Sequence, residues 1–253
     1  MTPLVVSPIP LDAPIHGPRG IVLSDLHLFS GRERRTLDAW LAQPHAEYAA
    51  WVFNGDILDL KWAPWPPEEA AKRACDWMIA FAHAHPHAQI HWVMGNHDGY
   101  EAMRHVLVQA SLPANLHWHA EYCRLGAYLF LHGDLLLLKT PRAQRFWPVL
   151  PPLPKDARTR ARYEHPLQLR LHFSASLLMQ PQLLVRWMGK HLPRLHPAEW
   201  AAARHIITGH THRPYRQFSH LGKDWSNTGS AVQGIRFEPL EFAYAATAVS
   251  SAG

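Results

Sequence analysis

The stretch that decides the fold is Gly95-Asn96-His97-Asp98, which directly follows the apolar run Ile90-His91-Trp92-Val93-Met94. An apolar run of this length, closed by a glycine, predicts a buried strand that stops abruptly. The strand end then presents an amide, an imidazole and a carboxylate. These four residues alone establish little, because turns rich in Gly, Asn and Asp are common.

Four further stretches repeat this arrangement, each directly after an apolar run. They are Ser24-Asp25-Leu26-His27, Gly55-Asp56, His132-Gly133-Asp134 and Gly209-His210-Thr211-His212. Each one alone has an ordinary explanation as a solvated loop or turn, and a His-x-His pair is expected by chance among 20 histidines. Five such motifs at the ends of five predicted strands are not expected by chance. We therefore expect the fold to bring these five strand ends together.

Between the motifs, strand-like runs alternate with helical patterns. Strands are predicted at 20–24, 50–54 and 90–94, and helices at 36–43, 68–84 and 100–110. Such a repeat with short connections is typical of a parallel sheet with crossover helices, so the predicted fold class is α/β. After Pro113 we expect a hairpin, Asn115 to Arg124 with Ala127 to Leu131, and then strand-like runs at 205–208, 215–218, 231–237 and 240–246.

The composition predicts a single globular domain. A chain of 253 residues with 47% hydrophobic content can bury a sizeable core as one domain, 1–253. Cys75 and Cys123 lack metal-type spacing, and we expect reduced thiols in a cytosolic protein. We expect no signal peptide, because the first residues lack a charged segment. No window reaches the roughly 20 uninterrupted apolar residues of a membrane span, which leaves peripheral membrane contact open.

The net charge of +5 is unevenly distributed. Between Lys139 and Arg204, twelve basic residues accompany three acidic ones, a net charge of +9, whereas the rest of the chain carries thirteen and seventeen, a net charge of −4. We therefore define 139–204 as a basic insert, helical on either side of Pro181, that meets an anionic partner. Its apolar residues recur near helical spacing at 167–179 and 183–192. They either pack on the body beneath a solvated basic face, or form a lid for acyl chains and anionic lipid.

The five motifs supply carboxylate, imidazole and amide groups, which hard and borderline divalent metals bind. In open α/β sheets, ligands bind outside the carboxyl ends of the strands, where all these groups lie. Asp56 has two oxygens and can lend one to each of two metals. Seven such groups suffice for two metal ions with positions left for water and substrate. The candidate ligands are Asp25, His27, Asp56, Asn96, His132, His210 and His212.

Other histidines are interpreted as structural. His83, His85 and His87 fall at the end of a predicted helix, and we expect them to be solvated or to cap that helix. His117 and His119 alternate along a predicted strand, and we expect them at the surface.

The order of the five motifs resembles the calcineurin-like metallophosphoesterase superfamily from about Gly20 to Gly229, apart from the basic insert. The resemblance implies a sandwich of two sheets flanked by helices, with 139–204 as a lid. It also implies two divalent metal ions, with manganese expected and iron, zinc or cobalt as alternatives. One ion would be held by Asp25, His27, Asp56 and His212, and the other by Asp56, Asn96, His132 and His210.

The same resemblance and general metal chemistry imply a mechanism. A hydroxide bridging the two ions would attack the phosphorus of a phosphoester or pyrophosphate. His97 would protonate the leaving oxygen or stabilise the charge on it, and Asp98 would fix the tautomer of His97.

Three of the motifs are most similar to those of the UDP-2,3-diacylglucosamine pyrophosphatases. They are Ser24-Asp25-Leu26-His27-Leu28, Leu131-His132-Gly133-Asp134 and Gly209-His210-Thr211-His212-Arg213-Pro214. Those enzymes hydrolyse a nucleotide-lipid pyrophosphate at the membrane surface in lipid A biosynthesis, and they carry a basic helical insert between the fourth and fifth motifs. The resemblance implies a cytoplasmic enzyme, peripheral at the inner membrane face, with a lipid-nucleotide substrate and no protein partner. His97 departs from the pattern of the best-known branch of these pyrophosphatases, which has Arg at this position. A second branch has Gly-Asn-His-Asp, as this sequence does. The Asp-Arg-Gly motif of the Ser/Thr phosphatases of this superfamily is absent from the sequence after Gly55.

Substrate contacts are open to two interpretations each. Arg142 and Arg145 either bind a substrate phosphate or are surface residues, and Trp62 and Trp65 either wall the site or form a hydrophobic cap. Two other functions remain as alternatives. A nuclease or nucleotide phosphodiesterase would use the same metals, with the insert along a phosphate backbone. A non-catalytic metal-binding scaffold would be expected to lack ligands, yet all seven are present.

Overall fold

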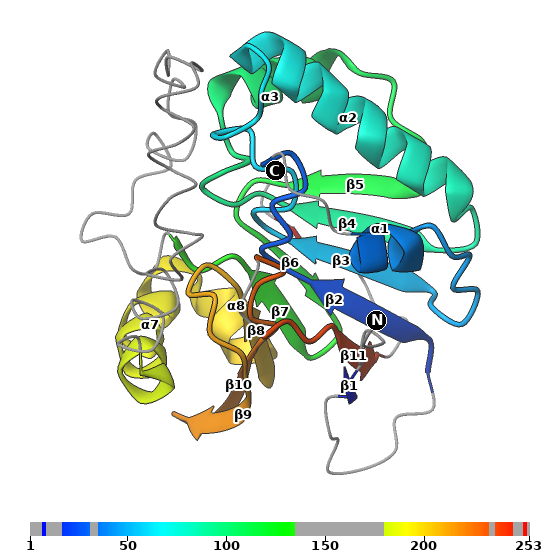
Figure 1. The fold of residues 1–253 in the computed structure, drawn as a ribbon. Coiled ribbons are helices and arrows are strands. Elements are labelled where there is room, and N and C mark those ends of the chain that lie inside the picture. The colour runs from blue at the N-terminus through cyan, green and yellow to red at the C-terminus, as the bar shows by residue number, and fades with distance from the viewer. Residues whose placement is uncertain are drawn as a thin grey trace.

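The computed structural model describes residues 7–8, 17–30, 35–134, 180–232, 236–244 and 250–251. Two six-stranded sheets pack against each other, and helices lie outside them (Figure 1). The predicted α/β sandwich of two sheets flanked by helices is confirmed.

The first sheet contains the strand–helix repeat. Its strand order is β1-β11-β2-β3-β4-β5, with β2 to β5 parallel and β11 antiparallel to β2. The strands are β1 (Ser7–Pro8), β11 (Leu240–Ala243), β2 (Arg19–Leu23), β3 (Ala50–Asn54), β4 (Gln89–Val93) and β5 (Leu116–His119). The connecting helices are α1 (Arg35–Leu41), α2 (Pro67–Ala84) and α3 (Glu101–Gln109). Figure 1 shows α2 and α3 over the face of this sheet that is turned away from the second sheet.

The second sheet has the order β12-β6-β7-β8-β10-β9. Its strands are β12 (Ser250–Ser251), β6 (Tyr122–Leu125), β7 (Tyr128–Leu131), β8 (His205–Thr208), β10 (Lys223–Asn227) and β9 (Tyr215–His220). β6 and β7 form the predicted hairpin with Gly126 in its turn, while β7, β8 and β10 run parallel. Two helices lie beside this sheet, α7 (Pro181–Leu195) and α8 (Pro197–Ala202) (Figure 1).

The expected hairpin strand from Asn115 to Arg124 is wrong in one respect. It is two strands in different sheets, because β5 pairs with β4 and the chain then crosses over to β6 in the second sheet. His119 is consequently 2% exposed rather than at the surface, and His117 is half-buried. The expected strand at 231–237 is reduced, among its described residues, to a single bridge between Gly229 and Phe237. Strand β10 was not predicted.

The hydrophobic core lies in three places. Between the sheets, Val22 and Val52 from the first sheet pack with Phe130 and Ile207 from the second. A larger cluster lies under α1, α2 and α3. The third is beneath α7, whose buried face packs on the second sheet. Helix formation after Pro181 is therefore confirmed, whereas residues 139–179 of the basic insert lie outside the described residues.

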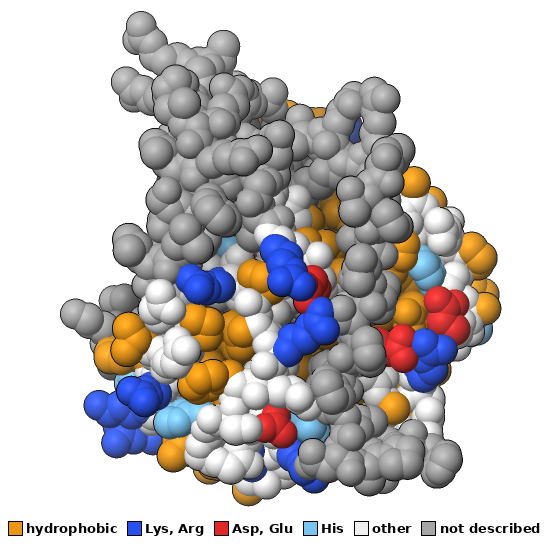
Figure 2. Space-filling model, turned by 60° about the horizontal axis from the view of Figure 1, so that its bottom comes forward, with side chains coloured by type: hydrophobic (Ala, Val, Ile, Leu, Met, Phe, Trp, Pro, Cys, Tyr) orange, Lys and Arg blue, Asp and Glu red, His pale blue; other side chains and the backbone are white. Residues whose placement is uncertain are grey.

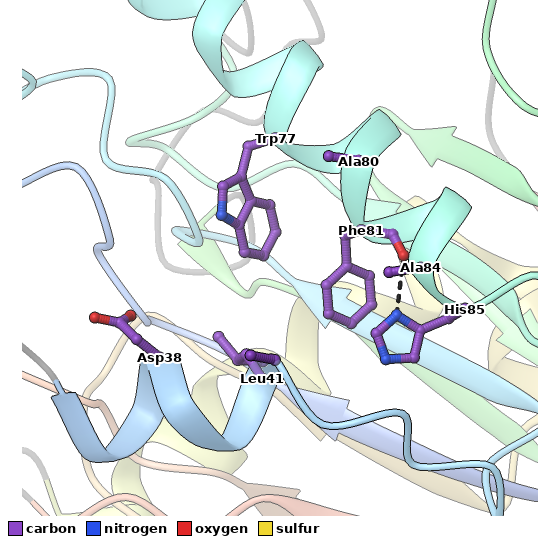
Figure 3. Close-up of a pocket in the computed structure, with 8 residues that line it drawn as sticks. Asp38, Leu41, Trp77, Ala80, Phe81, Ala84 and His85 are labelled. Carbon is purple, nitrogen blue, oxygen red and sulfur yellow. Dashed lines mark hydrogen bonds between the residues drawn. The ribbon is translucent and has the colours of Figure 1, made fainter.

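A cavity of about 330 Å³ lies between α1 and α2 (Figure 3). Its wall includes Trp77, Phe81 and His85, which project from α2 toward α1. His85 is the residue that caps α2, and its Nδ1 lies 2.9 Å from the Phe81 carbonyl, in agreement with the capping interpretation. No candidate metal ligand lines this cavity. None of the described helices is long and apolar enough to cross a membrane.

Candidate metal centre

The structure brings the five motif-bearing strand ends to one place, where both sheets contribute. Asp25 and His27 follow β2, Asp56 follows β3, and Asn96 follows β4 in the first sheet. His132 follows β7, and His210 and His212 follow β8 in the second sheet. Parallel strands end at the same edge of a sheet, and the packing of the two sheets places those edges side by side.

One group of donors consists of Asp25, His27 and His212, whose ligand atoms lie within 4.8 Å of one another. His212 Nε2 is 3.2 Å from Asp25 Oδ1 and 3.3 Å from His27 Nε2. The backbone amide of His210 donates to both oxygens of Asp25, at 3.1 and 3.0 Å. These bonds fix the carboxylate between the two sheets.

A second group consists of Asp56, His132 and His210, with Asn96 beside it. His132 Nε2 lies 3.2 Å from Asp56 Oδ2 and 3.3 Å from Asn96 Oδ1. On the other side of the ring, Nδ1 lies 3.1 Å from the carbonyl of Asn54, to which it can only donate. Nε2 is therefore the nitrogen presented to the group, as is usual for histidines that bind metals.

Asp59 joins two of the histidines. Its Oδ2 lies 2.9 Å from His27 Nδ1, and its Oδ1 lies 2.7 Å from His97 Nδ1. The expectation that Asp98 orients His97 is therefore wrong. Asp98 instead accepts the backbone amides of Ile57 and Leu58, at 2.9 and 3.1 Å, and so ties the loop after β3 to the end of β4.

The loops of the centre hold an uncommon backbone conformation. Nine described non-glycine residues have positive φ, and six of them lie in this centre. These six are Asp25, His27, Asp56, Asp59, His210 and His212. Each such conformation costs on the order of 1–3 kcal/mol unless the surroundings impose it, and it concentrates at functional sites. The fold therefore stabilises these loops at the expense of local backbone strain.

Two motif glycines are required by close approach. A Cβ on Gly95 would overlap the side chain and backbone nitrogen of Asp56, and one on Gly209 would overlap Ser24 and Asp25. The Ser24 hydroxyl donates a short hydrogen bond to Asp25. The glycines thus leave room for the carboxylates to turn inward.

The electrostatics of the centre separate charged from neutral groups. Burial alone would raise the pKa of Asp56, but the imidazoles of His132 and His97 outweigh it and hold that pKa well below its usual range. Burial would lower the pKa of His132, yet Asp56 and Asp25 raise it well above its usual value. For His210, burial and the neighbouring His132 lower the pKa to about 4. Its lone pair is therefore free near neutral pH.

His97 differs from the other imidazoles. Burial opposes its protonation, but the carboxylates of Asp59 and Asp56 raise its pKa to about 9. For Asp98, burial acts in the other direction, and together with the nearby Asp56 it raises the pKa of this carboxyl group to about 7. His97 therefore carries a proton under neutral conditions.

Sequence comparison bears directly on this geometry. Residues 19–214 match the family model described as calcineurin-like phosphoesterase. The chain belongs to this family. It is a metal-dependent phosphohydrolase that acts on phosphoesters, and the resemblance read from the motifs is confirmed at this level.

Several solved structures are similar to this chain at low sequence identity. A dimetal phosphatase from Danio rerio is 14% identical, with 90% of this chain and 99% of that chain covered and a TM-score of 0.45. Vps29 from Chaetomium thermophilum is 15% identical, with coverage of 87% and 75% and a TM-score of 0.40. A predicted phosphoesterase from Streptococcus pneumoniae is 14% identical, with coverage of 86% and 75% and a TM-score of 0.34. No protein with a curated functional description matches the sequence significantly.

The donor set of this phosphoesterase fits divalent cations. Buried carboxylates and imidazole nitrogens converge in two adjacent groups, and glycines leave space for them. Buried carboxylates of this kind are costly without cations or hydrogen-bond donors around them. Oxygen and nitrogen donors suit manganese, iron, zinc and cobalt alike, so the chemistry fixes the class of ion and not its identity.

The other predicted site residues have different outcomes. Trp65 packs edge-to-face on Phe29 at 5.2 Å between ring centroids, and Arg73 lies 4.5 Å over its ring, which favours the hydrophobic-cap interpretation. Trp62 is half-buried, and its backbone amide lies 3.3 Å from Asp59 Oδ1. Arg142 and Arg145 lie outside the described residues.

Sequence reasoning missed Asp59. The available signal was its spacing, because Asp59 follows Asp56 by three residues in the same loop.

Proposed function

We propose that this phosphohydrolase uses a dinuclear metal centre to hydrolyse the pyrophosphate of a nucleotide-linked lipid of the UDP-2,3-diacylglucosamine type. The observation that carries the dinuclear centre is the convergence of six carboxylate and imidazole donors in two adjacent groups, with Asn96 Oδ1 beside the second group. One ion is assigned to Asp25, His27, Asp56 and His212, and the other to Asp56, Asn96, His132 and His210. When bound, two such cations supply an activated water and neutralise charge on the phosphorus oxygens.

The protein's own contribution to bond breaking is assigned to His97. Asp59 occupies Nδ1 of this imidazole at 2.7 Å, so the proton available to a substrate is on Nε2. The carboxylate of Asp59 also favours the protonated form of this imidazole, because it raises the pKa of His97. His97 donates it to the leaving oxygen as the bond to phosphorus breaks.

The lipid part of the proposal is supported by the outer face of α7. Leu183 and Trp187 are 63% and 39% exposed one helical turn apart, and exposed Arg186 and Lys190 flank them. Exposed apolar and basic side chains mixed on one helix face are typical of helices at an anionic lipid surface. The opposite face, with Leu184, Val185 and Met188, packs on the second sheet, as the packing interpretation expected.

A substrate panel tests the assignment. Purified protein with added Mn²⁺ is given UDP-diacylglucosamine, bis-p-nitrophenyl phosphate, a cyclic nucleotide and single-stranded DNA. We expect release of UMP from the lipid nucleotide to exceed turnover of the others. Faster cleavage of DNA with a steep salt dependence would favour the nuclease alternative. Turnover of none of them would contradict the proposed substrate class.

The described surface bears on the nuclease alternative. In the view of Figure 2, the described Lys and Arg side chains form separate groups among hydrophobic and acidic side chains. Two further arginines, Arg216 and Arg236, both form ion pairs with Glu238. Among the residues that the structure describes, neither feature favours a continuous basic track for a phosphate backbone.

The lipid role of α7 has its own test. Leu183→Ser combined with Trp187→Ser should reduce flotation with anionic liposomes and reduce turnover of the lipid substrate, with bis-p-nitrophenyl phosphate unaffected. Val108→Ser is the matched control, because Val108 is 70% exposed on α3. Equal flotation of both variants and the wild type would remove the lipid role of α7.

A further inference from the structure

A second cluster of metal-binding side chains lies outside the candidate metal centre. His91 on β4, His119 on β5 and Cys123 on β6 place one ligand atom each within 4.8 Å of one another. They are 1%, 2% and 0% exposed, respectively. None of them belongs to the five motifs, and the proposed hydrolysis uses none of them.

The cluster sits where the chain passes from the first sheet to the second. His91 and His119 point from neighbouring strands into the space between the sheets, and Cys123 faces them from the second sheet. His117, opposite His91 in the pairing of β4 with β5, stacks over His91 at 5.3 Å and is half-buried. A ligand held by these three side chains would therefore link the two sheets at their crossing point.

The two imidazoles are spaced for a shared cation. His91 Nδ1 lies 3.1 Å from His119 Nε2. Two nitrogens bound tetrahedrally to one zinc ion are about 3.3 Å apart, given Zn–N bonds of about 2.0–2.1 Å. The same distance also suits a plain hydrogen bond between neutral rings, so the spacing alone does not decide.

The hydrogen bond between the two imidazoles leaves the other nitrogen of His119 without a partner. His119 Nδ1 is buried and has no hydrogen-bond partner. An unpaired buried polar atom destabilises the folded protein. A cation bound through Nε2 leaves this Nδ1 as it is, so the case for a ligand rests on the grouping itself, a thiol and two imidazoles within 4.8 Å of one another in an apolar core.

We propose that His91, His119 and Cys123 form a separate structural site for a thiophilic cation, of which Zn²⁺ is the expected occupant. One thiolate and two imidazoles favour zinc or Cu⁺ over magnesium, calcium and manganese. On binding, the Cys123 thiol loses its proton to solvent and its sulfur coordinates the ion. Burial holds both imidazoles neutral, with the pKa of His91 lowered to about 3 and that of His119 to about 4, so their lone pairs are available.

The chemistry of the two centres allows them to be distinguished. All seven proposed ligands of the dinuclear centre bind through oxygen or nitrogen, whereas the second site contains a sulfur. A thiolate bound to Co²⁺ gives a charge-transfer band in the near ultraviolet, which oxygen and nitrogen ligands do not give. The proposal does not depend on the proposed function, and Asp56→Asn should keep this band.

The experiment is to produce the protein in zinc-poor medium with Co²⁺ and record its absorption spectrum and metal content. Cys75→Ser is the matched control, because Cys75 is the other buried free cysteine and lies in none of the candidate metal clusters. We expect the band in the wild type and in Cys75→Ser, and its loss in Cys123→Ser together with one equivalent of metal. His119→Gln should also weaken it.

A wild-type spectrum without the band overturns the proposal and leaves a hydrogen-bonded histidine pair in the core. So does a band that persists in Cys123→Ser. If Cys123→Ser does not fold, the wild-type spectrum and His119→Gln still decide the outcome.

Discussion

Replacing Asp59 by Asn removes one charge and one acceptor at the junction of the candidate metal centre and its proton donor. Asp59 is fully buried and accepts from His27 at 2.9 Å and from His97 at 2.7 Å. Both imidazoles must carry their proton on Nδ1 if Nε2 is to face a metal or a substrate. An Asn side chain has one acceptor and one donor at this place. It can therefore support only one of the two rings, and its NH₂ group opposes the other.

The size of the loss in activity depends on which imidazole ring, His27 or His97, loses its hydrogen bond to residue 59. Loss of support for a metal-bound histidine costs about 10–100-fold in activity or metal affinity. Loss of a general acid costs about 10²–10⁴-fold. Among the groups that raise the pKa of His97, Asp59 has the largest effect, so its neutralisation also lowers that pKa and disfavours protonated His97. We expect kcat for an alkyl phosphodiester to fall about 100-fold or more, roughly 2.7 kcal/mol of transition-state stabilisation.

Leaving-group dependence is the measurement that isolates this effect. A p-nitrophenyl ester needs little proton donation, so Asp59→Asn should lose only about 10-fold on it. Asp98→Asn is the matched control, because it makes the same substitution at a buried carboxyl group that bonds the amides of Ile57 and Leu58 instead. This variant should lower the melting temperature, because the NH₂ group of the new side chain would face a backbone N–H, which costs about 1–3 kcal/mol of folding stability. Its effect on the turnover of the two esters should be the same. A larger leaving-group effect in Asp98→Asn than in Asp59→Asn would refute the assignment.

Three further outcomes are expected. Gly95→Ala should lose its bound metal, as measured by mass spectrometry, because the added methyl group overlaps Asp56. Gly222→Ala is the control, since its methyl group meets open space at a φ of +69°. It should lose about 1 kcal/mol of stability and keep its metal. Dialysis against a chelator should abolish turnover and added divalent metal should restore it; turnover that survives full removal would contradict metal dependence. In the metal-free protein, burial lowers the folded pKa of His91 to about 3 and of His119 to about 4, while unfolded imidazoles titrate near about 6.5. The unfolded state then binds more protons as pH falls below about 6.5, so stability should decrease from there toward pH 4, and chemical denaturation of His91→Leu should show a shallower decrease.

The strands around the centre were predictable because they are buried on both faces. Strand β3 spans Ala50–Asn54, as expected from its unbroken apolar run, and all five of its residues are buried. Strand β4 differs from its prediction by one residue at each end. A run of this kind has no alternating polar face, so its limits are set by the first residues that cannot be buried.

The crossing from β5 to β6 was not predictable in this way. Leu116–His119 and Tyr122–Leu125 are separated by two residues, and nothing in that spacing distinguishes one bent strand from two strands in two sheets. The consequence reaches His119, which was expected in solvent and lies in the core at 2% exposure. Periodicity tells which residues share a face, but the partner of that face is set by tertiary packing.

The same distinction explains which parts of the two metal sites the sequence reveals. Donor types were evident from the motifs, yet Asp98 was expected to orient His97, and the geometry gives that place to Asp59. Asp59 reaches His97 because the backbone at Asp56 and Asp59 is left-handed. The whole fold imposes this conformation, and a non-glycine residue gives no indication of it in the sequence. His91, His119 and Cys123 gave no spacing signal either, because they come from three strands, and pairing between strands rather than distance along the chain makes them neighbours. Residue type therefore predicts which ligands a site can offer, while strand pairing and backbone strain decide which of them meet.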